Sequence, residues 1–163
     1  MSVNPSISLN KVKEELVRCN EYVEKYSWLI TELDESNQAF TVQMTSPLDN
    51  ETYILEVIYS DYPELPLILE FVDPETGQRG TKHAYPKGCD SFFHGAPCIC
   101  NPASRKSYKE FNPSGPHKPD KDWQLAGWKK HPKVGTLTTI DSILKAIYLR
   151  ISDDRFYQRK RME

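Results

Sequence analysis

The stretch that decides the fold runs from Phe40 to Phe71 and has the sequence FTVQMTSPLDNETYILEVIYSDYPELPLILEF. Apolar and polar residues alternate over residues 40–44 and again over 67–71, and residues 53–59 are rich in β-branched and aromatic side chains. These patterns are typical of β-strands. Turn-forming residues separate the segments, and a short apolar segment at residues 28–33 precedes them. We therefore expect four strands with short connections, which favours an antiparallel meander.

An N-terminal helix is predicted before these strands. Apolar residues recur at spacings of three and four between Leu9 and Tyr26, which indicates one buried helix face. Ser8 or Asn10 is the expected cap. Cys19 lies on the apolar face, where we expect it to act as a small core residue. This helix would cover one face of the meander.

A second helix is predicted near the end of the chain. Thr138 and Asp141 form a Thr-x-x-Asp capping signature, and isoleucine and leucine recur at helical spacing over residues 140–151. The highly charged residues 152–163 are expected to form a short helix or a frayed tail. Together these elements predict one α+β domain over residues 1–163, with its core at about residues 8–151.

Composition narrows the class of protein. With 163 residues, of which 38% are hydrophobic and 27% charged, the chain can form one domain with a real core. Residues 1–4 lack a signal-peptide layout, and no apolar run is long enough to span a bilayer. We therefore expect a cytoplasmic protein with no membrane partner, whose four cysteines are reduced thiols.

The net charge of -2 conceals a gradient along the chain. Residues 1–81 contain five basic and fifteen acidic residues, a balance of -10. Residues 82–133 contain ten basic and four acidic residues, a balance of +6, and residues 134–163 add +2. The basic segment is suited to attract an acidic partner, although a solvated, lysine-rich loop would have the same composition. Nucleic-acid binding is not expected, because this segment shows neither a basic helix nor an aromatic-decorated sheet.

The basic segment contains the sequence HGAPCICNP at residues 94–102. It lies within about sixty residues without clear periodicity, and a loop of that length inside a compact domain tends to be functional. The pattern Gly-x-x-Cys-Ile predicts an exposed nucleophilic thiol at Cys98. Positive charge on Lys87, Arg105 or Lys106 would favour its thiolate. Such a thiol can carry an acyl group as a thioester, which predicts a transferase.

The order of these features resembles the ubiquitin-conjugating enzyme (UBC) fold over residues 8–151. The segment YPELPL at residues 62–67 is similar to the family motif Tyr-Pro-x-x-Pro-Pro. GAPCI at residues 95–99 is similar to the active-site segment Gly-x-x-Cys-Leu/Ile. Trp123 or Trp128, followed by residues 137–144, resembles the family tryptophan and the helix after it. The resemblance implies an N-terminal helix, a four-stranded meander, a long active-site loop and a C-terminal helix.

The chain departs from the family pattern in three respects. The family has His-Pro-Asn about ten residues before its cysteine, whereas here His83-Ala84-Tyr85-Pro86 stands fifteen residues before Cys98 and no asparagine follows His83. The family links that asparagine to stabilising the oxyanion or to shaping the active-site loop. The segment between Cys98 and Trp123 is expanded, and the last two helices of the family are absent or reduced to residues 153–163.

The departures resemble bacterial stand-alone members of the family. Some of these occur in anti-phage operons that signal through cyclic oligonucleotides (CBASS), and others in bacterial ubiquitin-like conjugation operons. The resemblance implies that Cys98 carries a protein C-terminus and passes it to a lysine. The expected donor is a ubiquitin-like protein or the cyclic-nucleotide synthase, a nucleotidyltransferase that this activity would regulate. No cofactor is expected, since a separate activating enzyme would use any ATP.

Five residues of the loop region have expected roles. Cys98 is the candidate nucleophile, against the alternative of a structural thiol where the loop meets the core. Cys100 is expected to pack inward, or else to resolve the thioester or pair with a neighbouring thiol. His83 is expected to order the loop through hydrogen bonds. Asn101, or backbone N–H groups of the loop, would stabilise the oxyanion. His94 either tunes Cys98 or is a solvated turn residue.

Two other classes of function stay open from the sequence. The first is a structural zinc site formed by four ligands that lie within twelve residues, with His83 or His117 nearby: Cys89, His94, Cys98 and Cys100. Against it, the spacing lacks the usual paired C-x2-C knuckle. The second is an inactive adaptor of the same fold. The missing asparagine favours the adaptor, and the presence of Cys98 argues against it.

Overall fold

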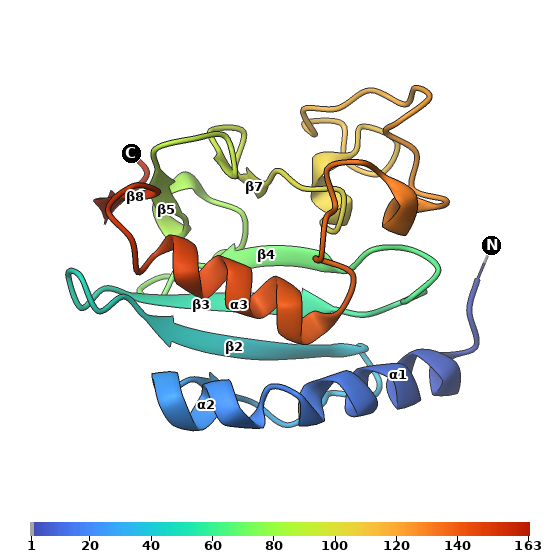
Figure 1. Cartoon of the computed structure of the whole chain (residues 1–163), viewed down its shortest axis with the longest axis horizontal. Coiled ribbons are helices and arrows are strands. Elements are labelled where there is room, and N and C mark those ends of the chain that lie inside the picture. The colour runs from blue at the N-terminus through green and yellow to red at the C-terminus, as the bar shows by residue number, and fades with distance from the viewer. Residues whose placement is uncertain (1) are drawn as a thin grey trace.

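The computed structural model describes residues 2–163, which form an α+β fold, as the sequence predicts (Figure 1). The α-helices are α1 (Pro5–Val17), α2 (Asn20–Tyr26) and α3 (Ile140–Arg150). The strands are β1 (Leu29–Ile30), β2 (Ala39–Thr45), β3 (Thr52–Ile58), β4 (Ile68–Val72), β5 (Pro86–Gly88), β6 (Phe93–His94), β7 (Cys98–Ile99) and β8 (Tyr157–Arg161). Short 3-10 helices span Lys82–Ala84, Arg105–Ser107 and Trp128–Lys130. No helix in the described range is long and apolar enough to cross a membrane.

Strands β1 to β4 form an antiparallel sheet in chain order, which confirms the predicted meander. Phe40 pairs with Val57 and Val42 pairs with Leu55, and Leu55 also pairs with Phe71 on β4. All five side chains are buried. Because side chains alternate across a strand, the period of two in the sequence places them on one face, where cross-strand apolar pairs stabilise the sheet.

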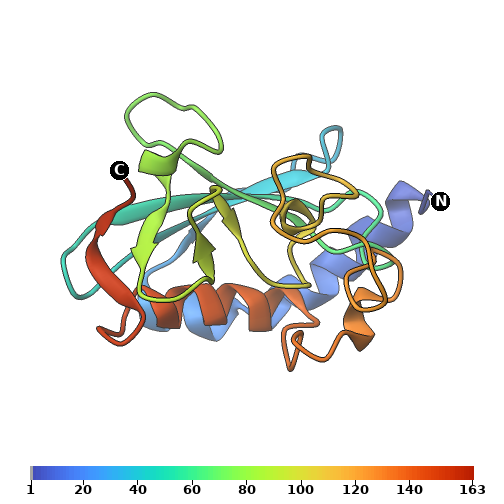
Figure 2. The same cartoon turned by 90° about the horizontal axis from the view of Figure 1, so that it is seen from above.

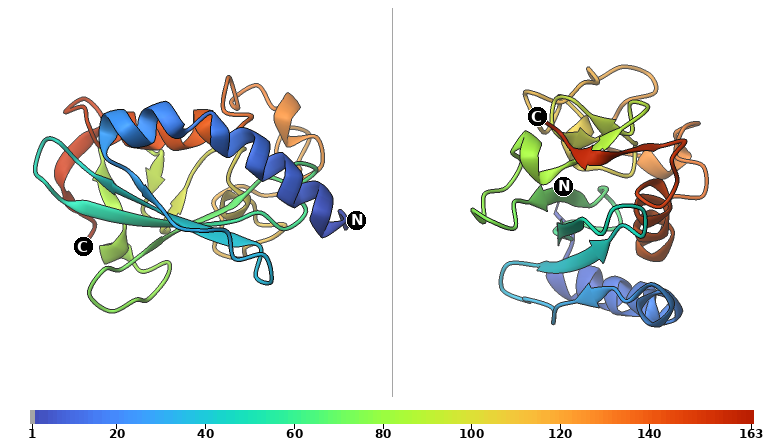
Figure 3. Two further views of the ribbon diagram at one scale, coloured as in Figure 1. Left: turned by 90° about the horizontal axis from the view of Figure 1, so that it is seen from below. Right: turned by 90° about the vertical axis from the view of Figure 1, so that its left-hand side faces the viewer.

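The three α-helices run along the same side of this sheet (Figures 2 and 3). Helix α3 packs against the core through the apolar residues that its sequence pattern predicts, all of them buried: Ile140, Ile143, Leu144, Ile147 and Ile151. Trp28, just before β1, is buried, and its ring centroid lies 5.7 Å from that of Tyr148 on α3. The core therefore lies between the helices and the inner face of the meander.

The N-terminal helix begins earlier than predicted and is interrupted. Its cap is Asn4 and not Ser8 or Asn10, because the Asn4 side chain accepts a hydrogen bond from the Ser6 N–H at 2.9 Å and Pro5 occupies the first turn. The helix breaks between α1 and α2 at Cys19. Cys19 is fully buried, as expected, and burial raises the pKa of its thiol to about 12.

The start of α3 is also one residue away from the predicted position. The cap is Thr139 rather than Thr138, and its partner is Ser142 rather than Asp141. The Thr139 backbone N–H donates to Ser142 Oγ at 3.2 Å, which is one half of a capping box. Two adjacent threonines made the choice ambiguous in the sequence.

Residues 73–137 extend beyond the β4 edge of the sheet as loops, 3-10 turns and very short strands (Figure 1). Two small strand pairs organise the segment: β6 pairs with β7, and β5 pairs with β8 from the end of the chain. Residues 157–161 thus form a strand, so the expectation of a helix or frayed tail over residues 152–163 is wrong. Their charged side chains suit a strand at the surface, because only Tyr157 among these five is buried.

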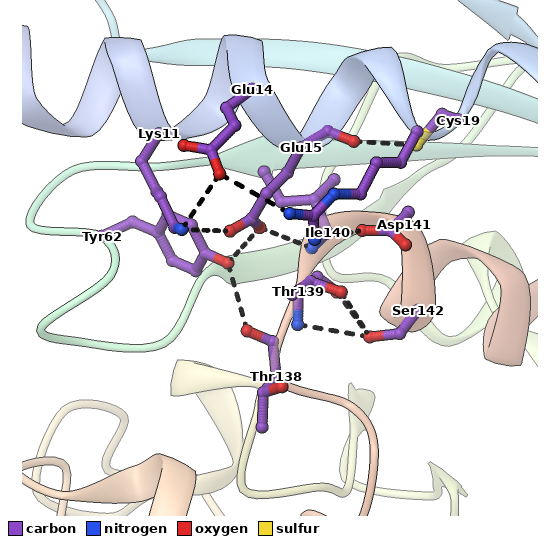
Figure 4. Close-up of polar contacts among 11 residues, drawn as sticks. Lys11, Glu14, Glu15, Cys19, Tyr62, Thr138, Thr139, Ile140, Asp141 and Ser142 are labelled. Carbon is purple, nitrogen blue, oxygen red and sulfur yellow. Dashed lines mark hydrogen bonds and ion pairs between the residues drawn. The ribbon is translucent and has the colours of Figure 1, made fainter.

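One buried carboxylate ties the helices to the sheet (Figure 4). The Glu15 side chain on α1 has no exposed surface, and its Oε1 accepts hydrogen bonds from the Tyr62 hydroxyl at 2.5 Å and the Ile140 N–H at 2.8 Å. Lys11 Nζ lies 3.5 Å from Glu15 Oε2. The acceptor position at the N-terminus of α3 also favours a negative charge. Glu15 therefore joins α1, the segment after β3 and the start of α3.

We predict that Glu15→Ala lowers the free energy of unfolding by about 3 kcal/mol or more, because it removes the close acceptor of two buried donors, the Tyr62 hydroxyl and the Ile140 N–H. Glu14→Ala is the matched control, since the Glu14 side chain on the same helix is 57% exposed. The control is expected to change stability by no more than about 0.5 kcal/mol. Urea unfolding followed by circular dichroism measures both variants. Equal midpoints for the two would contradict the role of Glu15.

Candidate active site

The cysteine loop is built on the β6–β7 hairpin. His94 pairs with Cys98, and Phe93 pairs with Ile99. In the turn between the strands, the Ala96 N–H donates to His94 Nδ1 at 3.0 Å. His94 therefore stabilises the turn, and one of its ring nitrogens is already occupied.

Cys98 is buried, so the expectation of an exposed thiol is wrong. The residue is 1% exposed, and burial, together with the neighbouring Cys100, raises the pKa of its thiol to about 12. Its thiolate fraction at neutral pH is consequently far below that of a free cysteine. Strand pairing with His94 turns this side chain toward the protein interior. The arrangement corresponds to the alternative of a structural thiol where the loop meets the core.

Cys100 is the more accessible of the two cysteines and has a histidine partner. It is only half-buried, contrary to the expected inward packing, and its Sγ lies 3.0 Å from His117 Nε2. Its backbone N–H donates to the Phe92 carbonyl at 2.7 Å, which anchors the residue to the hairpin. Burial raises the pKa of Cys100, and the charge of Lys133 acts in the opposite direction. A thiol beside an imidazole is the arrangement of an activated cysteine nucleophile.

His117 is held by its backbone and by one aromatic ring. Its N–H donates to the Ser107 carbonyl at 3.1 Å, and its carbonyl accepts from the Lys109 N–H at 2.8 Å. The imidazole stacks on the Trp123 indole with a centroid distance of 3.6 Å and an interplanar angle of 2°. Burial, followed by the charge of Lys133, lowers the pKa of His117. The lowered pKa favours the neutral imidazole, which is the form that can accept a proton.

The two tryptophans that sequence reasoning left as alternatives have separate roles. Trp128 is buried, and its Nε1–H donates to the Pro63 carbonyl at 3.0 Å, so it packs on the YPELPL segment. Trp123 stacks on His117 and has His131 near its ring at 4.5 Å. Trp128 thus supports the fold, whereas Trp123 belongs to the candidate site.

Asn101 closes the turn that follows Cys100. Its Oδ1 accepts from the Ala103 N–H at 2.9 Å, and its carbonyl accepts from the Ser104 N–H at 2.9 Å. The backbone N–H groups of Cys100 and Asn101 already donate to carbonyls, and Pro102 has no N–H. The Asn101 Nδ2 group makes no hydrogen bond within residues 2–163. It is the free donor of this turn.

His83 is not brought to the cysteine loop. It is exposed and lines a surface pocket with Asp49 and Arg161, and its carbonyl accepts from Arg161 Nη1 at 3.2 Å. The His83 side chain makes no hydrogen bond within residues 2–163, so the structure does not support the expectation that it orders the cysteine loop through hydrogen bonds. The strand β8, which the sequence did not predict, explains this placement.

The cation that acts on the Cys100 thiol is Lys133, and not Lys87, Arg105 or Lys106 as expected for the cysteine loop. The charge of Lys133 opposes the rise that burial causes in the pKa of Cys100, whereas Arg105 is buried and donates to the carbonyls of Ser60 and Pro66. Lys106 forms an ion pair with Glu70 at 3.1 Å. The arginine thus fastens the loop to the YPELPL segment and does not act on the thiol.

The zinc alternative is not supported. No group of three or more His, Cys, Asp or Glu side chains in residues 2–163 lies close enough together to hold a metal ion. Cys89 is exposed and lies near the Asp154 carbonyl, with a separation of 3.9 Å from its Sγ. The four expected ligands therefore do not converge.

Sequence reasoning missed the pairing of Cys100 with His117 and considered His117 only as a zinc ligand. The two lie seventeen positions apart in a segment without periodicity, so no spacing rule connects them. The only available signal was the presence of a histidine in the long segment after the cysteines. The pairing depends on how that segment folds back.

Comparisons with known proteins do not assign the chain to a family. No protein-family model matches the chain, and no curated protein matches it in sequence.

We predict that the four cysteines differ in reactivity toward a limiting amount of iodoacetamide at pH 8. Cys89 and Cys100 should be alkylated, because they are exposed and half-buried, respectively. Cys19 and Cys98 should react only after denaturation, since burial raises the pKa of each thiol to about 12. Peptide mass spectrometry of native and denatured protein measures this order. Alkylation of Cys98 as fast as that of Cys89 would contradict its burial.

Proposed function

We propose that this protein is an acyl carrier of the ubiquitin-conjugating type, which forms a thioester and passes the acyl group to an amine. The observation that carries the proposal is the 3.0 Å contact between Cys100 Sγ and His117 Nε2. The resemblance assigns the thioester to Cys98, and the geometry favours Cys100. We therefore place the acyl group on Cys100.

The surroundings of the loop support this proposal. The N-terminal helix, the meander with the YPELPL segment between β3 and β4, the cysteine loop and the C-terminal helix follow one another in the order expected for the ubiquitin-conjugating fold. Trp128 packs on the YPELPL segment through its hydrogen bond to Pro63. A buried Arg105 joins the same segment to the residues after Cys100. The loop that holds the thiol is thus fastened to the sheet, as a preorganised site requires.

In the first step, His117 Nε2 accepts the Cys100 proton, and the thiolate attacks the acyl carbon of the donor. The tautomer that leaves the Nε2 lone pair free is the one that can act as this base. The new S–C bond replaces the bond between the acyl group and its previous carrier. The departing carrier takes the proton from His117.

In the second step, an unprotonated amine attacks the thioester. A C–N bond forms and the C–S bond breaks, while the attacking nitrogen loses a proton that reaches the departing Cys100 thiolate through His117. The negative charge of the tetrahedral intermediate needs a hydrogen-bond donor. Asn101 Nδ2 is the donor that the turn leaves free, and its orientation is set because Oδ1 is held by the Ala103 N–H.

The donor and acceptor follow from the resemblance alone. A protein C-terminus is the proposed donor, and a protein lysine is the proposed acceptor. In a CBASS operon the donor would be the nucleotidyltransferase, and in a conjugation operon a ubiquitin-like protein. The basic segment at residues 82–133 is suited to attract acidic surfaces of such partners.

An inactive adaptor of the same fold is the second candidate. The burial of Cys98 favours it, because the thiol that the motif resemblance assigns is not presented to a partner. The pairing of Cys100 with His117 argues against it, since an adaptor has no use for a thiol with a base.

The test is co-expression with candidate operon partners, followed by non-reducing intact-mass analysis. Wild type is expected to form a thiol-sensitive adduct, and Cys100→Ser a stable oxyester. Cys100→Ala should lose the adduct, and Cys98→Ala should keep it. If Cys98→Ala alone loses the adduct, the thioester lies on Cys98 and the assignment to Cys100 is wrong. If no variant forms an adduct with any partner, the adaptor replaces the carrier.

We predict a separate effect for Asn101→Asp. Aspartate keeps an oxygen that can accept from the Ala103 N–H but removes the Nδ2 donor. The thioester should still form, and its transfer to an amine should slow by about a hundredfold, the usual loss on removing one oxyanion donor. Single-turnover discharge to free lysine measures the rate. Unchanged discharge would show that another group stabilises the oxyanion.

A further inference from the structure

We infer that Tyr108 is the positioning residue of the Cys100–His117 pair, an inference that rests on the proposed function. Tyr108 is fully buried and contacts both sides of the pair. The three contacts are independent of one another: a side-chain hydrogen bond, a backbone bridge and an aromatic contact.

The first contact reaches the cysteine side. The Tyr108 hydroxyl donates to the Pro102 carbonyl at 2.7 Å, two residues after Cys100. Burial raises the pKa of Tyr108, so the phenol remains a donor throughout the working pH range. The phenol is the one hydrogen-bond donor to the Pro102 carbonyl within residues 2–163, so it anchors this carbonyl.

The second contact reaches the histidine side through the backbone. Tyr108 and His117 form a parallel β-bridge, with the hydrogen bonds made by the neighbours Ser107 and Lys109. The intervening loop turns back at Gly115. A Cβ at Gly115 would lie 2.9 Å from the Tyr108 carbonyl carbon and 2.9 Å from the Asn112 carbonyl oxygen. The close return of this loop therefore requires glycine.

The third contact reaches the imidazole through an aromatic ring. The Tyr108 ring meets the Trp123 indole edge-on, with centroids 5.4 Å apart. The indole in turn stacks on His117. An edge-to-face contact on one side and a stack on the other restrict the plane of the indole, and the indole restricts the plane of the imidazole.

These contacts make the distance between Cys100 and His117 depend on one side chain. Without the phenol, the Pro102 carbonyl loses a buried donor and the turn after Cys100 is free to move relative to the His117 loop. A displacement of about 1 Å at a reacting pair is enough to cost as much as a hundredfold in rate. Tyr108 is fully buried, so it acts through the positions of Cys100 and His117 and not by contact with the donor or the amine.

The test combines Tyr108→Phe with His117→Ala in a double-mutant cycle. The readout is the pH profile of Cys100 alkylation by iodoacetamide, followed at the peptide level. Tyr108→Phe keeps the ring contact with Trp123 and removes only the hydroxyl. We expect alkylation at pH 7 to slow by about tenfold or more, with the profile moving toward that of His117→Ala. Cys100 in the double variant should be alkylated no more slowly than in His117→Ala, because the two substitutions disrupt the same Cys100–His117 interaction.

Tyr59→Phe is the matched control. Tyr59 is 1% exposed, and its hydroxyl has no hydrogen-bond partner within residues 2–163. Its pH profile should equal that of wild type. Gly115→Ala is a second variant that keeps the phenol but displaces the Tyr108 backbone, so it should reproduce the loss if Tyr108→Phe fails to fold.

Additive effects of Tyr108→Phe and His117→Ala, or a wild-type profile in Tyr108→Phe, would overturn the inference. The alkylation assay needs no acyl donor. Absence of a thioester in wild type would therefore refute the proposed function, while the cycle still decides whether Tyr108 positions the pair.

Discussion

The Glu15 carboxylate is the interaction on which the arrangement of the whole molecule depends. A fully buried acid is tolerated only when it is paired and hydrogen-bonded, and here Lys11 on the same helix provides the cation while two hydrogen-bond donors, Tyr62 and Ile140, come from segments distant in sequence. Tyr62 begins the YPELPL segment, so the same contact that docks α1 onto α3 also places that segment. Trp128 and Arg105 then hydrogen-bond to its carbonyls. The candidate site is thus connected to Glu15 by a short series of contacts.

In the long segment between β4 and α3, the backbone N–H and C=O groups form hydrogen bonds although the segment has no extended strands. Buried N–H and C=O groups must find partners, and in a loop these partners come from turns and side chains. Asn101, Ser107 and Tyr108 bond to carbonyls or amides within the segment, and Arg105 bonds to carbonyls outside it. The same bonds that satisfy the loop also hold Cys100 near His117. These hydrogen bonds therefore both stabilise the loop and position the candidate site.

The two cysteines show why a local motif does not decide a reactive thiol. Cys98 and Cys100 differ by two positions, yet one is buried in a strand pair and the other is half-buried beside an imidazole. The thiolate fraction of each depends on burial and on neighbouring charges, and none of these is a property of the motif. The histidine and lysine that act on Cys100 come from residues 117 and 133, well beyond the motif.

By itself, the sequence determined the elements whose period is visible along the chain. Alternation over residues 40–44 and 67–71, with the β-branched and aromatic content of residues 53–59, was enough for the meander, and the helical spacing of isoleucines and leucines was enough for α3, because local periodicity selects the buried face. Tertiary structure alone decided the pairing of β8 with β5, the placement of His83 away from the cysteine loop, the burial of Cys98 and the contact of Cys100 with His117. Each depends on segments that meet across the fold without a repeating pattern, so their contacts follow from packing and from the satisfaction of buried polar groups.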